Sequence, residues 1–375
     1  MLSPKERLTR QARGLEVDRV PTLGGWIGGA ETLADLAGLT VEEYLRDPPA
    51  GLVRAHLALG VDGMVGPVVP RQRRQLRTGA VTEASFPDRE PEDLVACAEA
   101  LPDDERGVLA GFDAAAAERV YREHFLAAFR DWRGIVPVPN FWELGGPFPL
   151  YTEFGYVAFL SACALYPEAV GKIWWTRSIV AREKAKILAR LYRELDLVPL
   201  LFCGEDLCNN QGPLVAPEML RAHYFPHVRR IVEPLVDAGV RLVHHCDGDV
   251  RPLVDDFIGL GFSGLQGFQY ELGIDLRAFA ARRSLRGESL LLFTGLSVTR
   301  TLPFGTPDDV RAEVDYFHDV TSGGAGMFLF TSNVTGIDVP PENLRAAYAR
   351  ARERPAGRPA PSPRREWPGL RVDGG

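Results

Sequence analysis

The chain has few cysteines, no long apolar run and no excess of positive charge. Its 375 residues include five cysteines, an odd number that fits a reducing compartment better than a disulfide framework. No apolar run approaches the roughly 20 residues that span a bilayer, and the charged start MLSPKERLTRQARG lacks the apolar centre of a signal peptide. Lysine and arginine number 43 against 50 acids, giving a net charge of -7, which argues against a protein that coats nucleic acid. We therefore expect a cytoplasmic protein that binds small molecules, with no nucleic-acid or membrane partner.

Short apolar runs alternate with longer stretches of helical periodicity, which is the pattern of a parallel sheet covered by helices. Most of these runs are continuously apolar, as expected where helices cover one face and a packed barrel interior meets the other. No GxGxxG or GxxxxGK[ST] element opens a helix anywhere in the chain, so the usual phosphate-binding signature of an open doubly wound sheet is missing. The sequence therefore predicts an α/β fold, a closed (β/α)8 TIM barrel with an N-terminal extension. We expect eight strands, at 19–25, 63–69, 135–141, 197–203, 240–246, 264–269, 290–296 and 326–332.

Two helices are predicted from their end signals. One runs from Pro217 to Gly239, and the other has Thr306 as N-cap, Pro307 in the first turn and acids after it, up to residue 320. The chain as a whole is expected to form one barrel domain over residues 1–352. Residues 353–375 are rich in proline, arginine and glycine, a composition typical of a mobile tail.

Reactive groups of such barrels lie where strands end and loops begin, so polar residues at strand ends are the candidates. The stretch VHHCDGDVRP ends one strand with two histidines, a thiol and a carboxylate. Alternate residues of a strand point the same way, so His245 and Asp247 share one face. His244 and Cys246 share the other. Histidine and cysteine are ligands that zinc prefers, and the candidate metal ligands are therefore His245, Asp247 and Cys246.

The preceding strand supplies two further carboxylates, and the predicted catalytic set is His245, Asp247, Glu205 and Asp206. Predicted substrate contacts are Glu143, Gln266, Gln269, Asn333 and Trp26. Ordinary structural roles stay open: the acids could cap a helix or pair with arginine, and one histidine could pack under a helix. Cys203 and Cys208 lack CxxC spacing and are interpreted as structural. The basic run at 71–77 fits either a solvated face or a grip on an anionic ligand.

Five blocks of sequence, in order, resemble the uroporphyrinogen decarboxylase superfamily, and specifically its corrinoid-linked methyltransferase-like branch. They are KERLTRQARGLEVDRVP, GEDLCNNQGPLVAPEMLR, HHCDGDVRPLVDDFIGLGFSGLQ, LPFGTPDDVRAEV and VPPENLRAAY. The resemblance covers nearly the whole chain and implies the (β/α)8 barrel. It does not choose the reaction, because one fold hosts several chemistries.

In the branch that forms methyl-coenzyme M, the family resemblance implies an HxC pair and a later cysteine that bind zinc and hold the acceptor as a thiolate. With the glycine of the HxCG motif as anchor, the motif falls on residues 245–248, so Asp247 stands at the thiolate position. With HxC as anchor, the pair is His244 and Cys246. Thr335 stands near the place of the later cysteine. The resemblance therefore implies a site with oxygen ligands, or one without metal.

Three functions follow from this resemblance. The first is a methyltransferase that moves a methyl group between a corrinoid and a small molecule. Because the chain has no DxHxxG cobalamin signature, the corrinoid would come from a partner protein, and a homodimer is also expected. The second is a cofactor-free decarboxylase or lyase, although GGWIGGAETLADL replaces the arginine-rich element of the decarboxylase itself. The third is a barrel that binds a tetrapyrrole or corrinoid without catalysis.

Overall fold

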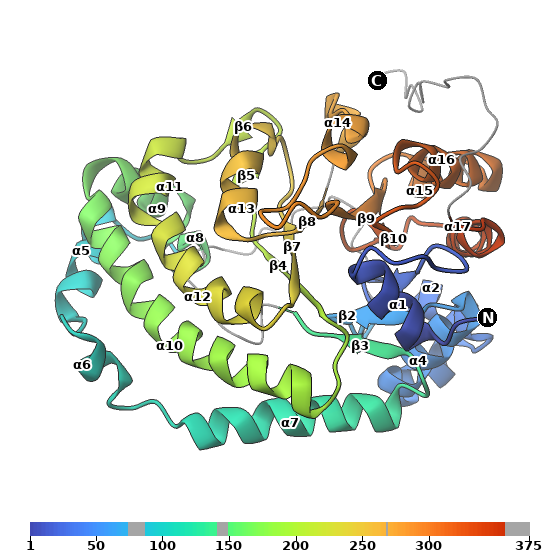
Figure 1. Ribbon diagram of the computed structural model, residues 1–375, viewed down its shortest axis with the longest axis horizontal. Helices are drawn as coiled ribbons and strands as arrows, with labels where there is room; N and C mark the ends of the chain where they lie inside the picture. The colour runs from blue at the N-terminus through green and yellow to red at the C-terminus, as the bar shows by residue number, and fades with distance from the viewer. Residues whose placement is uncertain (74–86, 141–148, 268, 357–375) are drawn as a thin grey trace. The chain divides into compact units, whose positions relative to one another are not determined.

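The computed structural model describes residues 1–73, 87–140, 149–267 and 269–356. Contacts within the chain divide it into two compact units, each of mixed α/β structure (Figure 1). Unit 1 comprises Met1–Ala80, Leu126–Pro139 and Gly264–Gly375, and unit 2 comprises Val81–Phe125 and Asn140–Ser263. The single domain over residues 1–352 stays a prediction. Most of the expected tail, from residue 357 on, lies outside the described residues.

Unit 1 is built on two groups of parallel strands. In the first group β1 (Leu23–Gly24) pairs with β2 (Gly63–Val65), and β2 pairs with β3 (Val136–Val138). In the second group β9 (Leu291–Leu296) lies between β8 (Gly264–Gln266) and β10 (Met327–Thr331). A bridge between Thr22 and Leu329 joins the two groups. The strands are buried along their whole length, as expected for parallel strands covered by helices.

Two helices of unit 1 contact these strands: α1 (Pro4–Ala12) contacts β2, and α16 (Pro307–Val320) contacts β9 and β10. Helix α16 shows why they form: Thr306 caps its N-terminus in a capping box with Asp309, and Pro307 follows in the first turn, as predicted. The helical elements of this unit are α1 (Pro4–Ala12), α2 (Ala30–Ala37), α3 (Val41–Arg46), α4 (Pro48–Leu59), η3 (Tyr270–Leu272), α14 (Leu276–Ala280), α15 (Thr301–Phe304), α16 (Pro307–Val320) and α17 (Pro341–Glu353).

Side chains from the two ends of the sequence hold unit 1 together. The Gln11 amide in α1 donates hydrogen bonds to the carbonyls of Gly324 and Met327, at 2.6 and 2.8 Å. The Tyr348 hydroxyl in α17 donates to the carbonyl of Leu23 at 2.7 Å. Because these groups are buried, each bond satisfies a polar atom that water cannot reach. The N-terminal extension is therefore part of the packed unit.

Unit 2 contains a parallel pair of strands, β4 (Leu200–Gly204) and β7 (Arg241–His245), and a small antiparallel pair, β5 (Cys208–Asn209) and β6 (Gly212–Pro213). The long helix α10 packs along α12, as Figure 1 shows. Helix α7 (Ala114–Asp131) starts in this unit, and its residues from Leu126 on belong to unit 1. The other helical elements are α5 (Pro91–Ala100), α6 (Glu105–Leu109), α8 (Tyr151–Phe154), α9 (Tyr156–Leu165), α10 (Pro167–Glu194), α11 (Pro217–His223), α12 (Phe225–Asp237), η2 (Arg251–Leu253) and α13 (Val254–Leu260).

Each of the eight predicted strands overlaps an observed parallel strand, most with shorter bounds. The prediction of one helix from Pro217 to Gly239 is wrong. The structure has two helices with a break at Tyr224, because Pro226 has no backbone N–H and its ring would clash with the carbonyl four residues earlier. The β5–β6 hairpin was not predicted, since two-residue strands carry no periodic signal.

Within the part of the chain that the structure describes, every helix is too short or too polar to cross a membrane.

Candidate functional site

The candidate site lies at the carboxyl ends of β4 and β7 in unit 2. The register of this parallel pair sets Gly204 opposite His245, so the residues after β4 emerge beside those after β7. Gly204 has a φ of +128°, and a Cβ at this position would lie 2.1 Å from the carbonyl oxygen of His245. Only glycine permits this approach of the two backbones. The glycine therefore brings Asp206 within reach of His245.

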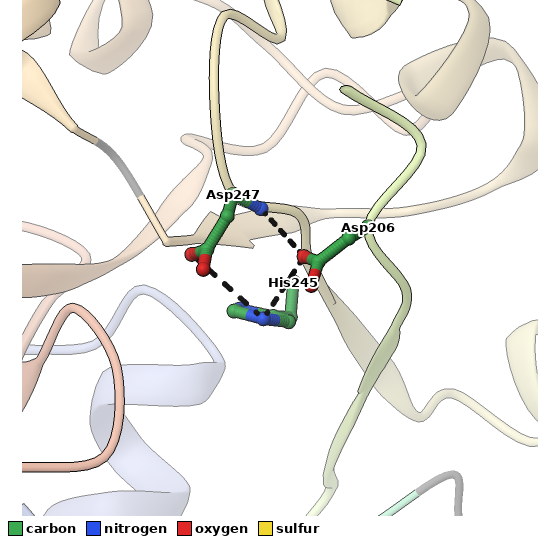
Figure 2. Close-up of side chains that lie close together, drawn as sticks. All are labelled: Asp206, His245 and Asp247. Carbon is green, nitrogen blue, oxygen red and sulfur yellow. Dashed lines mark hydrogen bonds and ion pairs between the residues drawn. The ribbon is translucent and has the colours of Figure 1, made fainter. Parts of the chain in front are cut away.

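The structure brings together Asp206, His245 and Asp247, three of the four predicted catalytic residues (Figure 2). His245 Nε2 lies 3.5 Å from Asp206 Oδ1 and 3.9 Å from Asp247 Oδ1. The backbone N–H of Asp247 donates to Asp206 Oδ1 at 2.9 Å and so holds that carboxylate in place. The imidazole is buried, whereas the side chains of Asp206 and Asp247 are 43% and 25% exposed. The cluster is thus open to a ligand on its carboxylate side.

The donor set of this cluster fits a divalent metal ion. One atom from each residue can be chosen so that all lie within 4.8 Å of one another. Ligand atoms of a tetrahedral zinc ion, at about 2.0–2.2 Å from the metal, are separated by roughly 3.3–3.6 Å, close to the two nitrogen-to-oxygen distances seen here. Two carboxylates together also match the charge of a divalent ion. Asp206 is the third candidate ligand in this group, whereas the sequence predicted Cys246 beside His245 and Asp247.

His244 faces away from the cluster, as the alternation along the strand predicts. Its ring stacks on Phe257, with ring centroids 4.0 Å apart, and meets the edge of Phe262 at 4.7 Å. Burial, with a smaller effect of His245, lowers the pKa of His244 to about 3, so the ring is neutral at physiological pH. Of the two histidines, His244 is therefore the one that packs against a helix, a role that the sequence left open.

The thiols near the cluster are buried and bonded to neighbouring backbone. Cys246 Sγ accepts a hydrogen bond from the Leu207 N–H at 3.3 Å and donates to the Asp247 carbonyl at 3.3 Å. Burial raises the pKa of the Cys246 thiol, and the adjacent Cys208 raises it further. Cys203 donates to the carbonyl of Val243. A buried, protonated thiol is a poor metal ligand, so these contacts fit structural roles.

Glu205, the remaining predicted catalytic residue, is a buried acid next to Asp206. One of its oxygens accepts a hydrogen bond from the Tyr224 hydroxyl, and the other has no hydrogen-bond partner among the described residues. Burial raises its pKa well above the usual range of a carboxyl group, and the charge of Asp206 adds to the effect. Burial therefore favours the protonated form of Glu205.

The other predicted contacts belong to unit 1 or fall outside the described residues, and their part in the site stays a prediction. Glu143 and residues 74–77 of the basic run fall outside the described residues. The Gln266 amide in unit 1 donates to the carbonyls of Thr331 and Ser332, and the Trp26 ring packs on Phe330 at 5.1 Å. Asn333 Oδ1 accepts a hydrogen bond from its own neighbour, the N–H of Val334. Gln269 is half-buried, and its Oε1 has no hydrogen-bond partner in the described ranges. Binding of an anionic ligand by the basic run at 71–77 stays a prediction. Arg73, the last residue of this run that the structure describes, pairs with Glu42 on the surface.

Sequence reasoning missed three tyrosines of unit 2. Tyr224 bonds to Glu205, and the negative charge of Asp206 contributes to the raised pKa of both Tyr151 and Tyr156. None of them belongs to a motif, and each stands in or beside a helix rather than at the end of a strand. The only available signal was the density of aromatic residues in 151–159.

Comparison with known proteins gives the fold. No protein-family model matches this chain. No curated protein matches its sequence either. Among solved structures, the chain is similar to a methyltransferase from Methanosarcina mazei, with a TM-score of 0.62, 18% identity, and coverage of 94% of this chain and 99% of that one. At this identity the likeness shows a shared fold over nearly the whole length of both proteins.

Proposed function

We propose that the protein is a methyltransferase whose small-molecule acceptor is held by a metal ion at Asp206, His245 and Asp247. The observation that carries the proposal is this cluster of two carboxylates and one imidazole at adjacent strand ends. The shared fold with a protein described as a methyltransferase supports it, as does the sequence resemblance to the corrinoid-linked branch. The methyl group would come from, or go to, a corrinoid on a partner protein.

The transfer itself needs little from the protein beyond orientation and a place for a proton. A corrinoid on a partner protein would supply the methyl group and would keep the electron pair of the bond that the methyl group leaves, and a lone pair on the acceptor heteroatom would form the new bond. A bound zinc ion would lower the pKa of the acceptor and so supply a usable nucleophile at neutral pH. Asp206, the most exposed carboxylate of the cluster, would accept the proton and pass it to water.

Glu205 would serve the reverse direction. Because burial favours its protonated form, Glu205 would give a proton to the heteroatom from which a methyl group departs. The Tyr224 hydroxyl holds one of its oxygens, and the second oxygen is left to transfer the proton. The two adjacent carboxyl groups therefore differ in role because they differ in burial.

Metal content is the decisive measurement. We expect about one zinc per chain in the purified protein, measured by plasma mass spectrometry, and a loss of at least about 100-fold in metal affinity in His245→Ala, since one of three protein ligands is gone. His244→Phe is the matched control: it changes the neighbouring histidine, keeps the stack on Phe257, and should retain the metal. Asp206→Asn should also weaken binding.

Absence of metal from the supplemented wild type would overturn the metal-held acceptor. The observation then left is the protonated, buried Glu205, which favours the second candidate, a cofactor-free decarboxylase or lyase that uses this carboxyl as its acid. In that case Glu205→Gln should abolish turnover, and added metal should have no effect.

We also propose that the parallel strands of the two units belong to the closed barrel expected from the sequence. Support comes from the six strands of unit 1, in the order β3, β2, β1, β10, β9, β8, and from the parallel pair β4 and β7 of unit 2.

A further inference from the structure

A short segment after β8 is fastened by side chains to helix α16 and to the loop after β9, all within unit 1. The segment is Gln269–Gly273, which contains the turn η3. The Tyr270 hydroxyl donates a hydrogen bond to Glu313 Oε1. The Tyr270 ring lies against Tyr316 and Phe317, with centroids 6.1 and 5.9 Å apart. Because positions 313, 316 and 317 share one face of α16, a single helix face binds this side chain at both its ring and its hydroxyl.

A second carboxyl contact holds the next residue of the segment. Glu271 Oε1 accepts a hydrogen bond from the Ser297 hydroxyl. The Ser297 N–H donates to Glu313 Oε1 at 3.1 Å, so one residue after β9 binds both carboxyl groups. The outer side of the segment is less enclosed: residues 269–272 are half-buried, and Gly273 is exposed. Gly273 has a φ of +80°, and a Cβ there would meet no heavy atom within 4 Å. The segment is therefore held by side-chain contacts and has room to move at its end.

Glu313 is the buried acid of this arrangement. It is 0% exposed, and its Oε2 has no hydrogen-bond partner among the described residues. The groups that face it are the Tyr270 hydroxyl and the Glu271 carboxylate from η3, the Ser297 N–H after β9, and the Thr301 hydroxyl at the start of α15. Burial raises the pKa of Glu313 to about 8, and the charge of Glu271 adds to the effect. Hydrogen bonds from Tyr270 and Ser297 oppose it. The closed segment therefore favours the protonated acid at pH 7.

The other elements that pack on α16 bring their charged groups to other residues of that helix. On α14, Arg277 and Asp275 influence the pKa of Tyr316. On α17, Arg350 pairs with Asp315 at 2.9 Å. The strands β9 and β10, which also contact α16, consist of residues without titratable side chains. The acid–base behaviour of the buried cluster therefore depends on its own two carboxyl groups.

We propose that residues 269–273 form a pH-sensitive latch, which is closed on α16 at low pH and released locally as the pH rises, because release lets Glu313 ionise in water. A glutamate in water has a pKa of about 4.3, so each opening above this pH gives up one proton. The opening equilibrium constant therefore rises about tenfold per pH unit between about pH 5 and pH 8. Gln269, a predicted substrate contact, is the first residue of the latch, so release would displace that side chain as well. This consequence, unlike the latch itself, depends on the predicted role of Gln269.

Hydrogen exchange of the full chain, followed by mass spectrometry from pH 6 to pH 7.5, tests the latch. The reporters are the N–H groups of Leu272 and Gly273, which donate to the carbonyls of Gln269 and Tyr270 at 2.9 Å, and the N–H of Ser297. After correction for intrinsic exchange rates, the protection of these amides in the wild type should fall about tenfold per pH unit. Because release is local, they should also be at least about tenfold less protected than the amides of β9.

Three variants separate the groups of the latch. Glu313→Gln keeps the size of the side chain and an oxygen that accepts hydrogen bonds, but it cannot ionise, so protection should stay constant with pH within about twofold. Glu271→Gln is the matched control: it removes the neighbouring, half-buried carboxyl and should keep the pH dependence of the wild type. Tyr270→Phe keeps the ring and loses the hydrogen bond to Glu313. It should lower protection about fivefold at pH 6 and keep the dependence on pH.

Protection that is constant with pH in the wild type, or that keeps its pH dependence in folded Glu313→Gln, would overturn the inference. Equal protection of the latch and of β9 would also overturn it, because release would then be global unfolding. Circular dichroism of each variant establishes folding. If Glu313→Gln does not fold, Tyr270→Phe decides: unchanged protection in that folded variant contradicts the latch. The measurement involves neither metal nor turnover, so its result is independent of the proposed function.

Discussion

The two units each contain a cluster around buried or half-buried carboxylates, and the clusters differ in what balances the charge. In unit 1, Asp62 is 1% exposed and accepts hydrogen bonds from the guanidinium groups of Arg7 and Arg19 and from the Thr22 N–H. In unit 2, Asp206 and Asp247 lie beside the His245 imidazole, at 3.5 and 3.9 Å, and both acids reach solvent.

The difference shows why Asp206 and Asp247, rather than Asp62, are the candidates for a functional role. A buried charge persists only if it is paired and hydrogen-bonded, and the chain itself supplies both at Asp62. Asp206 and Asp247 instead lie beside a single imidazole, that of His245, and both side chains reach solvent. The role of a carboxylate therefore depends on which groups balance its charge. Variants in unit 1 and in unit 2 can both test this.

The largest effect is expected at Asp62. Asp62→Ala leaves two guanidinium groups without their shared partner, and breaking such a buried pair costs about 3–5 kcal/mol of the free energy of unfolding. Urea unfolding followed by circular dichroism measures this loss. Asp103→Ala is the control, because it removes an exposed ion pair with Lys172 and should change stability by less than about 1 kcal/mol. Similar losses in the two variants would contradict the distinction.

A smaller effect, dependent on pH, is expected at Asp18 of the same network. Hydrogen bonds from Arg7 hold the pKa of Asp18 below its usual range. The stability that Asp18 contributes is therefore complete above the unfolded pKa of about 4 and is lost as the pH falls below it. Asp18→Asn should cost about 1–2 kcal/mol at pH 7. The gap from the wild type should narrow toward pH 3, measured by urea unfolding at each pH. If the difference in unfolding free energy between wild type and variant grew as the pH fell, a group other than Asp18 would control the loss of stability in acid.

The smallest effect is expected at Cys246. Its thiol is bonded to the backbone on the side of Leu207 and is not part of the metal-type group. Cys246→Ala should therefore change zinc affinity by less than about twofold, or roughly 0.4 kcal/mol, measured by competition with a chelating dye. Loss of zinc in this variant would instead support His244 and Cys246 as the ligand pair, which one alignment of the family motif implies.

The repeated strands were predictable because each is a continuous apolar run ended by polar residues. The alternation along residues 244–247 also predicted which histidine joins Asp247, since the direction of a side chain on a strand depends only on the parity of its position. Local signals failed where a backbone constraint was decisive. Pro226 interrupts a helix whose periodicity runs on through it, and the hairpin at 208–213 is too short for a pattern.

Long-range contacts limited the prediction of the site. The sequence marked Asp206 as catalytic, but only the register of β4 and β7 shows that it, rather than Cys246, completes the group with His245. The stacking of Tyr151 on Tyr156 was not predicted for a different reason: the two rings belong to adjacent helices, α8 and α9, and no motif marks the contact.

The bonds from Gln11 to Gly324 and Met327, and from Tyr348 to Leu23, have a consequence for biosynthesis. The first helix and strand of unit 1 find their buried partners more than 300 residues later in the chain. During translation the N-terminal segment therefore stays incompletely packed until its partners Gly324, Met327 and Tyr348 have left the ribosome. For this period its apolar surface is available to chaperones, and we expect the newly made protein to depend on them more than a chain whose neighbours in space are neighbours in sequence.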